Sequence, residues 1–159
     1  MTTTTDRVTE RLLARLDAAW NDFHEAYAGL PDEQLLEPGV VGEWSVRDLI
    51  AHITWWEEEA LAHLPAILAG ERPPRYSTTY GGIDAFNALK TEERRDLPLD
   101  EVREQAVATH RRLVAYVEQA TAEHLRGDSR FRRRLRLDTY GHYPIHARDI
   151  RAWRERRGI

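Results

Sequence analysis

Apolar residues recur at spacings of three and four along most of this chain, and this period is the strongest constraint on its fold. Similar stripes run through residues 5–28, 44–67 and 99–120, and a last one begins between Asp138 and Tyr143 and ends near Arg156. No segment alternates apolar and polar residues as a half-buried strand does. The sequence therefore predicts an all-α fold, a four-helix bundle in a single domain spanning residues 1–159. The first stripe contains Val8, Leu12, Leu16, Ala19, Phe23 and Tyr27.

Local signals place the ends of these helices. Gly29-Leu30-Pro31 should end the first helix. Ser45 can accept a hydrogen bond from a backbone N–H near Asp48, which starts the second helix. Pro65 is expected to kink that helix or end it early. Pro144 either lies in the first turn of the last helix or bends it.

The stretch from residue 70 to residue 98 is rich in glycine and proline, with one short helical piece predicted at residues 83–94. A connector of this length is unusual inside a domain unless it crosses over or carries function. It fits a bundle with a long crossover between the second and third helices.

Composition excludes several classes of site. The 159 residues include no cysteine, so disulfides, thiolate metal sites and cysteine nucleophiles are excluded. No apolar run approaches 18 residues, and the N-terminal residues do not resemble a signal peptide. We therefore expect a cytoplasmic protein with no membrane partner. Nucleotide-binding glycine loops, serine-hydrolase elbows and di-iron or His-Glu-x-x-His motifs are also absent.

The charge is unevenly distributed although the net value is only −4. Residues 1–100 carry 9 basic and 19 acidic side chains, and residues 101–159 carry 14 and 8. Much of the basic excess lies in the run Arg130-Phe131-Arg132-Arg133-Arg134-Leu135-Arg136. This run could contact nucleic acid. We favour a solvated connector that pairs with the acidic first half, and expect no nucleic-acid partner.

Three histidines form the most informative chemical pattern. His142 and His146 are four residues apart, so in a helix both imidazoles would point the same way. His52 lies at the edge of the apolar stripe of another predicted helix, where a neutral imidazole needs a partner. A metal ion is one such partner, and a buried carboxylate or carbonyl is another. We interpret the remaining histidines as surface or incidental: His24, His63, His110 and His124.

The chain resembles a known family at this point. Residues 42–57 read Gly-Glu-Trp-Ser-Val-Arg-Asp-Leu-Ile-Ala-His-Ile-Thr-Trp-Trp-Glu, and this stretch resembles the second-helix signature of the DinB/YfiT-like four-helix bundles. Within that superfamily, the chain is most similar to the ClbS/DfsB branch. Three further stretches support this: residues 35–42, Phe86-Asn87 with residues 94–98, and Asp138-Thr139-Tyr140-Gly141-His142-Tyr143.

The resemblance implies an up-down-down-up bundle and, as in many superfamily members, a triad of histidine metal ligands. The matching positions are His52, His142 and His146. Three imidazoles with open coordination positions suit Zn²⁺, Ni²⁺ or Fe²⁺. Such an ion can activate a water molecule and polarise an electrophile.

Residues close to these histidines in sequence could complete a site. Trp55 and Tyr143 lie off the main apolar stripes of their helices and are candidates for the rim of a substrate pocket. Asp149, three residues after His146, could orient that imidazole or pair with an arginine.

These features lead to three hypotheses. The first is a metal-dependent small-molecule hydrolase or transferase, which the resemblance links to detoxification of, or self-resistance to, a reactive metabolite. The second is a protein that sequesters a small molecule without chemistry, and the third is a nucleic-acid binder. A homodimer is also compatible with the family resemblance.

Overall fold

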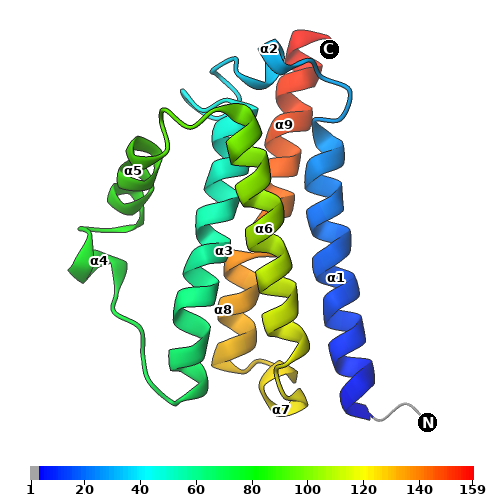
Figure 1. Cartoon of the computed structure of the whole chain (residues 1–159), viewed down its shortest axis with the longest axis vertical. Coiled ribbons are helices and arrows are strands. Elements are labelled where there is room, and N and C mark those ends of the chain that lie inside the picture. Colours follow the sequence, from blue (N-terminus) through cyan, green and yellow to red (C-terminus); the bar gives the residue numbers. More distant parts are fainter. Residues whose placement is uncertain (1–3) are drawn as a thin grey trace.

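Four helical columns make up the fold, and the fourth column is broken into two helices (Figure 1). The computed structural model describes the backbone of residues 4–159 and the side chains of residues 7–159, so residues 1–3 of the predicted domain lie outside it. The helices are α1 (Thr4–Ala26), α2 (Asp32–Leu35), α3 (Val46–Leu68), α4 (Tyr76–Thr79), α5 (Ile83–Glu93), α6 (Leu99–Glu118), α7 (Ala122–Leu125), α8 (Arg130–Asp138) and α9 (Tyr143–Arg157).

The columns run up, down, down and up, as expected. In Figure 1, α1 rises, α3 and α6 both descend, and α8 and α9 rise one after the other. α3 packs against α6 and α8, and α1 packs against α9. The segment with α4 and α5 links the lower end of α3 to the upper end of α6 along the outside of α3. The all-α bundle with its long crossover is therefore confirmed.

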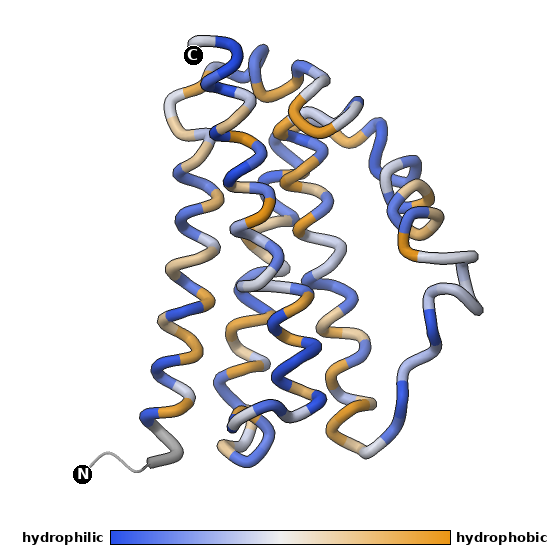
Figure 2. Tube along the Cα trace, turned by 180° about the vertical axis from the view of Figure 1, so that it is seen from behind, coloured by the Kyte–Doolittle hydropathy of each residue, from blue (hydrophilic) through white to orange (hydrophobic). Residues whose placement is uncertain are grey.

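The predicted stripes form the core. Leu12, Leu16 and Phe23 of α1 are 2%, 0% and 0% exposed, and Figure 2 shows hydrophobic and hydrophilic residues alternating turn by turn along this helix.

None of the described helices is both long enough and apolar enough to cross a bilayer.

Helix α3 begins with the cap that the sequence predicts. The Ser45 hydroxyl accepts from the Asp48 backbone N–H at 3.2 Å, and the Asp48 carboxylate accepts from the Ser45 N–H at 2.9 Å. The expected early end at Pro65 is wrong, because the helix continues to Leu68. Proline removes only one backbone hydrogen bond here, within the last turn of a 23-residue helix.

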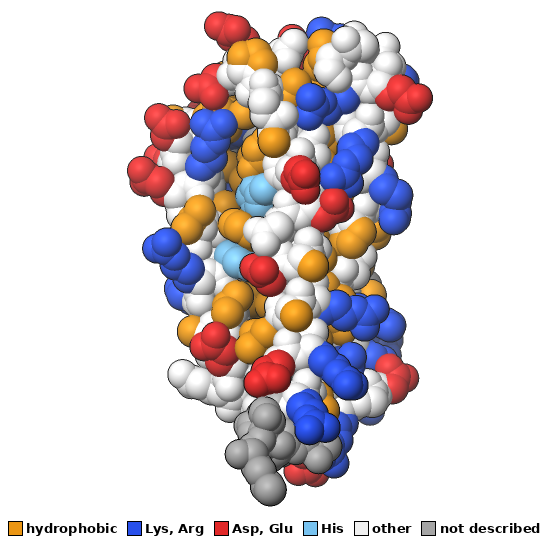
Figure 3. All heavy atoms as spheres, turned by 90° about the vertical axis from the view of Figure 1, so that its right-hand side faces the viewer, with side chains coloured by type: hydrophobic (Ala, Val, Ile, Leu, Met, Phe, Trp, Pro, Cys, Tyr) orange, Lys and Arg blue, Asp and Glu red, His pale blue; other side chains and the backbone are white. Residues whose placement is uncertain are grey.

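The arginine run is a helix and not the connector predicted from its charge. Ser129 caps α8 by accepting from the Arg132 N–H at 3.1 Å. Phe131 and Leu135, one turn apart, are 1% and 0% exposed, and α8 packs against α3. The ion pairs of this run also differ from the expected pairing with the acidic first half of the chain. Arg133 pairs with Asp128 and Arg134 with Asp138, and both acids lie in the second half. Figure 3 shows basic side chains along one edge of the α1 face, with acidic ones close by.

A short break between α8 and α9 sets the position of the last two predicted histidines. The Gly141 N–H donates to the Arg136 carbonyl at 2.8 Å, and α9 starts at Tyr143. Pro144 therefore lies in the first turn of α9, which is the first of the two predicted alternatives. His142 is the residue just before the helix, and His146 lies one turn later.

Candidate metal centre and adjoining cavity

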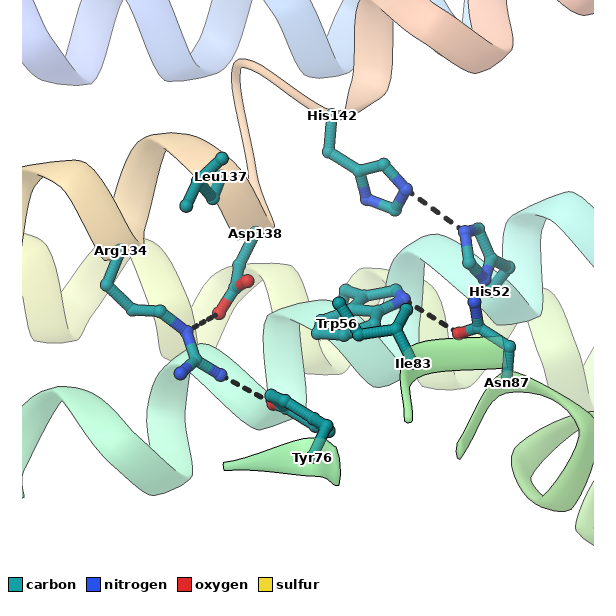
Figure 4. Close-up of a pocket in the computed structure, with 9 residues that line it drawn as sticks. All are labelled: His52, Trp56, Tyr76, Ile83, Asn87, Arg134, Leu137, Asp138 and His142. Carbon is teal, nitrogen blue, oxygen red and sulfur yellow. Dashed lines mark hydrogen bonds and ion pairs between the residues drawn. The ribbon is translucent and has the colours of Figure 1, made fainter. Parts of the chain in front are cut away.

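The structure brings together the three histidines that the sequence singled out. His52 projects from the middle of α3, and its Nε2 atom lies 3.0 Å from Nε2 of His142 (Figure 4). Nε2 of His146 lies 3.0 Å from the same His142 atom. One nitrogen from each ring falls in a group whose members are all within 4.8 Å of one another. Residues 90 positions apart in sequence therefore share one small volume.

Burial keeps these imidazoles neutral. His52 and His146 are 4% and 8% exposed. Burial, and then the neighbouring His142 and His146, lower the pKa of His52 to about 2. Burial and His146 lower the pKa of His142 to about 3. Burial also lowers the pKa of His146, although the nearby Asp149 carboxylate acts in the opposite direction. Near pH 7, each ring therefore has one nitrogen lone pair available.

Asp149 determines which nitrogen of His146 carries the proton. Its Oδ2 atom lies 3.1 Å from Nδ1 of His146, and a carboxylate can only accept a hydrogen bond. The proton is therefore on Nδ1, and the Nε2 lone pair faces the other two rings. Of the two predicted roles of Asp149, the contact with the imidazole is the one that the structure shows.

The contacts among the three rings fit a cation better than they fit hydrogen bonds alone. Because His146 offers a lone pair at Nε2, the two contacts of His142 Nε2 cannot both be well-formed hydrogen bonds with the single proton of a neutral ring. Among the described side chains, Nδ1 of His52 and Nδ1 of His142 are also buried without a partner. With the protons on these two Nδ1 atoms, three converging lone pairs form the donor set that Zn²⁺ and similar divalent ions prefer.

A cavity of about 320 Å³ opens beside the histidines. Trp56 and Leu137 give it apolar walls, and the crossover segment contributes residues from α4 and α5 (Figure 4). The Asn87 side-chain oxygen accepts from the indole N–H groups of Trp55 and Trp56, at 3.3 and 3.1 Å, and so fixes both rings. The lining residues are His52, Trp56, Tyr76, Ile83, Asn87, Arg134, Leu137, Asp138 and His142.

The end of the cavity away from the histidines is polar (Figure 4). Arg134 Nε donates to Asp138 Oδ2 at 2.6 Å, and Arg134 Nη2 donates to the Tyr76 hydroxyl at 2.7 Å. That hydroxyl donates in turn to Glu59 at 2.8 Å. Burial raises the pKa of the Asp138 carboxyl to about 6, although Arg134 acts to lower it.

Trp55 and Tyr143 do not lie at the rim of this cavity, which corrects the prediction of their positions. They are 2% and 0% exposed, and neither lines the cavity. Each helical residue is turned about 100° from the one before it, and at position 143 the side chain faces the core. There the Tyr143 hydroxyl donates to Glu57 at 2.7 Å. Trp55 instead packs edge-on against His52, with ring centroids 4.8 Å apart.

Several residues of the site carry no distinct signal of their own in the sequence. Trp56 both packs in the core and lines the cavity. Asn87 and Asp138 belong to stretches that carried the family resemblance, whereas nothing in the sequence pointed to Tyr76. His110 was interpreted as incidental, but it is 8% exposed and its Nδ1 lies 3.1 Å from the same Glu57 oxygen that Tyr143 contacts.

Comparison with known proteins finds solved structures of the same fold. The protein titled "Sibling Lethal Factor Precursor - DfsB" superposes with a TM-score of 0.78 at 17% identity over 98% of each chain. An uncharacterised protein from Escherichia coli UTI89 superposes with a TM-score of 0.77 at 15% identity, over 99% of this chain and 97% of the other. These likenesses show a shared fold. No curated protein sequence matches. The family model of the DinB superfamily matches residues 15–149, and the chain therefore belongs to that superfamily.

Proposed function

We propose that this protein is a metal-dependent enzyme, a hydrolase or transferase that acts on a small electrophilic organic molecule. The observation that carries the proposal is the convergence of three neutral imidazoles, two of which, His52 and His142, line a largely apolar cavity. The sequence resemblance to the ClbS/DfsB branch supports a role in detoxification or self-resistance, and the chain shares the fold of DfsB.

In this proposal His52, His142 and His146 hold a divalent ion, Zn²⁺, Ni²⁺ or Fe²⁺. When bound, such an ion polarises an electrophile and makes water or a thiol more acidic. The protein's own residues supply the rest. Asp149 holds His146 in the tautomer that a ligand needs. Trp56 and Leu137 remove water from around the substrate and offer apolar surface to its body.

Metal analysis of protein purified without a histidine tag tests the proposal. We expect about one equivalent of a divalent metal per chain, and loss of that metal in His142→Ala. His63→Ala is a matched control, because His63 bonds to Glu59 outside the triad and should leave the stoichiometry unchanged. Wild-type protein that binds no divalent ion after incubation with Zn²⁺, Ni²⁺ and Fe²⁺ would refute the metal site.

Sequestration without chemistry is the second candidate, and the apolar character of the cavity favours it. A cavity of about 320 Å³ is within the usual size range of ligand pockets. The two functions differ in turnover. An enzyme present at one hundredth of the concentration of a reactive electrophile would consume all of it, whereas a sequestering protein would remove only one equivalent.

A further inference from the structure

The Asp138 carboxylate is incompletely paired at the polar end of the cavity. The residue is 4% exposed, and its Oδ2 atom accepts from Arg134. Its Oδ1 atom makes no hydrogen bond with any described residue, and Asp138 contributes to the cavity lining. Figure 4 shows this second oxygen directed away from the arginine. Oδ1 is not among the described buried atoms that lack a partner, so it is open to the cavity, where a donor from a bound molecule can reach it.

Arg134 does not turn this end into an anion site. Its Nε and Nη2 atoms are already bonded to Asp138 and Tyr76. The single positive charge of Arg134 faces two carboxylates, because Glu59 accepts from the same Tyr76 hydroxyl. The nearby charges therefore favour an added cation over an added anion. The raised pKa of Asp138 agrees, because burial and Glu59 oppose the effect of Arg134 there.

An aromatic face beside this carboxylate suits a positively charged group with an apolar body. Trp56 and Tyr76 both line the cavity, and their ring centroids are 5.4 Å apart. The guanidinium of Arg134 already lies over the Tyr76 ring, 5.7 Å from its centroid, so the indole face of Trp56 is the surface that attracts a further cation. Ile83 and Leu137, 54% and 66% exposed, extend the apolar surface along the cavity.

We propose that the cavity binds a small organic amine whose ammonium group pairs with Asp138 and whose apolar body lies along Trp56. The rest of the molecule then extends toward His52 and His142, at the other end of the cavity. The claim that such an amine is the enzyme's substrate rests on the proposed function, whereas recognition of the amine requires no metal.

Three probes of similar size and different charge test the inference: 2-phenylethylamine, 2-phenylethanol and 3-phenylpropionate. Binding is measured at pH 7.5 from the chemical shifts of the tryptophan indole N–H groups, with zinc and with EDTA. We expect the amine to bind about tenfold more tightly than the alcohol, and the carboxylate to bind most weakly. Asp138→Asn should reduce the difference between amine and alcohol to less than about twofold. Asp128→Asn should preserve it, because Asp128 does not line this cavity.

A second measurement needs no variant. Affinity for the amine should fall as the pH drops through about 6, where Asp138 takes up a proton, while affinity for the alcohol stays constant. The charged and titratable groups around Asp138 are Arg134, Glu59, Tyr76, Tyr143 and His142.

The results separate this inference from the metal hypothesis. Three outcomes would overturn the amine site. The first is equal affinity for the amine and the alcohol, and the second is tighter binding of the carboxylate. The third is no binding of any probe at ~20 mM, a concentration at which even very weak ligands bind. Zinc binding without amine preference would refute the amine site alone. Amine preference in a protein that binds no metal would refute the metal site alone.

Discussion

At the scale of single residues, Asp149 makes the contact that holds His146, a candidate metal ligand, in place. Asp149→Ala removes the acceptor at 3.1 Å from His146 Nδ1, so the ring is free to turn and to change tautomer. We expect zinc affinity to fall about 10- to 100-fold, the usual effect of losing such a partner. Competition with a chromogenic chelator measures this. Asp17→Ala, on the exposed face of α1, should leave the affinity unchanged, and an equal loss in both variants would contradict the assigned role.

Asn87 supports a second prediction at this scale, because one side-chain oxygen satisfies two buried indole N–H groups. Asn87→Ala leaves both donors without a partner and should lower the free energy of unfolding by about 2 kcal/mol. Asn87→Asp keeps the acceptor and should cost clearly less. Urea unfolding of the two variants makes the comparison. If both lose the same stability, the indole contacts do not account for the role of Asn87.

The histidine positions could be predicted from sequence, whereas the cavity walls could not. His142 and His146 show the spacing of one helical turn, and His52 lies in a specific motif, so their convergence followed from the bundle topology. Tyr76 reaches the cavity from a glycine- and proline-rich crossover, where no periodicity reports which side chains face inward. Tyr143 was misplaced because its direction depends on the residue at which α9 starts.

At the scale of helical elements, the fourth column shows where sequence patterns are insufficient. With five arginines in nine residues, α8 offers only Phe131 and Leu135 as an apolar stripe, too short to distinguish from chance. The cap at Ser129 and the four-residue spacing were the available signals. The other three columns have long stripes, and their predicted ends lie within a few residues of those observed.

Gly141 makes the break between α8 and α9 possible, and it gives the element-scale prediction. A Cβ atom there would lie 2.7 Å from the Arg136 carbonyl oxygen, so the backbone would have to move. Gly141→Ala should cost about 1–3 kcal/mol of stability. It should also weaken zinc binding, because His142 is the next residue.

Urea unfolding and the chelator assay measure the two effects of Gly141→Ala. Adding Arg136→Ala should not rescue either effect, since the nearest atom belongs to the backbone. Rescue by that second change would instead assign the cost to the arginine side chain, whose Cγ would lie 3.0 Å from the new atom.

At the scale of the whole molecule, buried neutral histidines make the fold sensitive to acid. Burial and His110 lower the pKa of His24 to about 4, and burial also lowers the pKa values of His52 and His142. In the unfolded chain these groups bind protons near pH 6.5. Below that pH the unfolded state binds more protons than the folded state, so stability falls with falling pH.

We therefore expect the free energy of unfolding, measured with urea in the presence of EDTA, to decrease between pH 7 and pH 5. His24 alone should contribute about 2 kcal/mol of this decrease, so His24→Gln should show a shallower fall. Asp138 has the opposite effect on the pH dependence of stability. Its pKa of about 6 is above the unfolded value, so its protonation stabilises the fold as the pH drops, and Asp138→Asn should show a steeper fall below pH 6. A flat wild-type profile, or the same slope in both variants, would show that these buried groups do not link folding to protons.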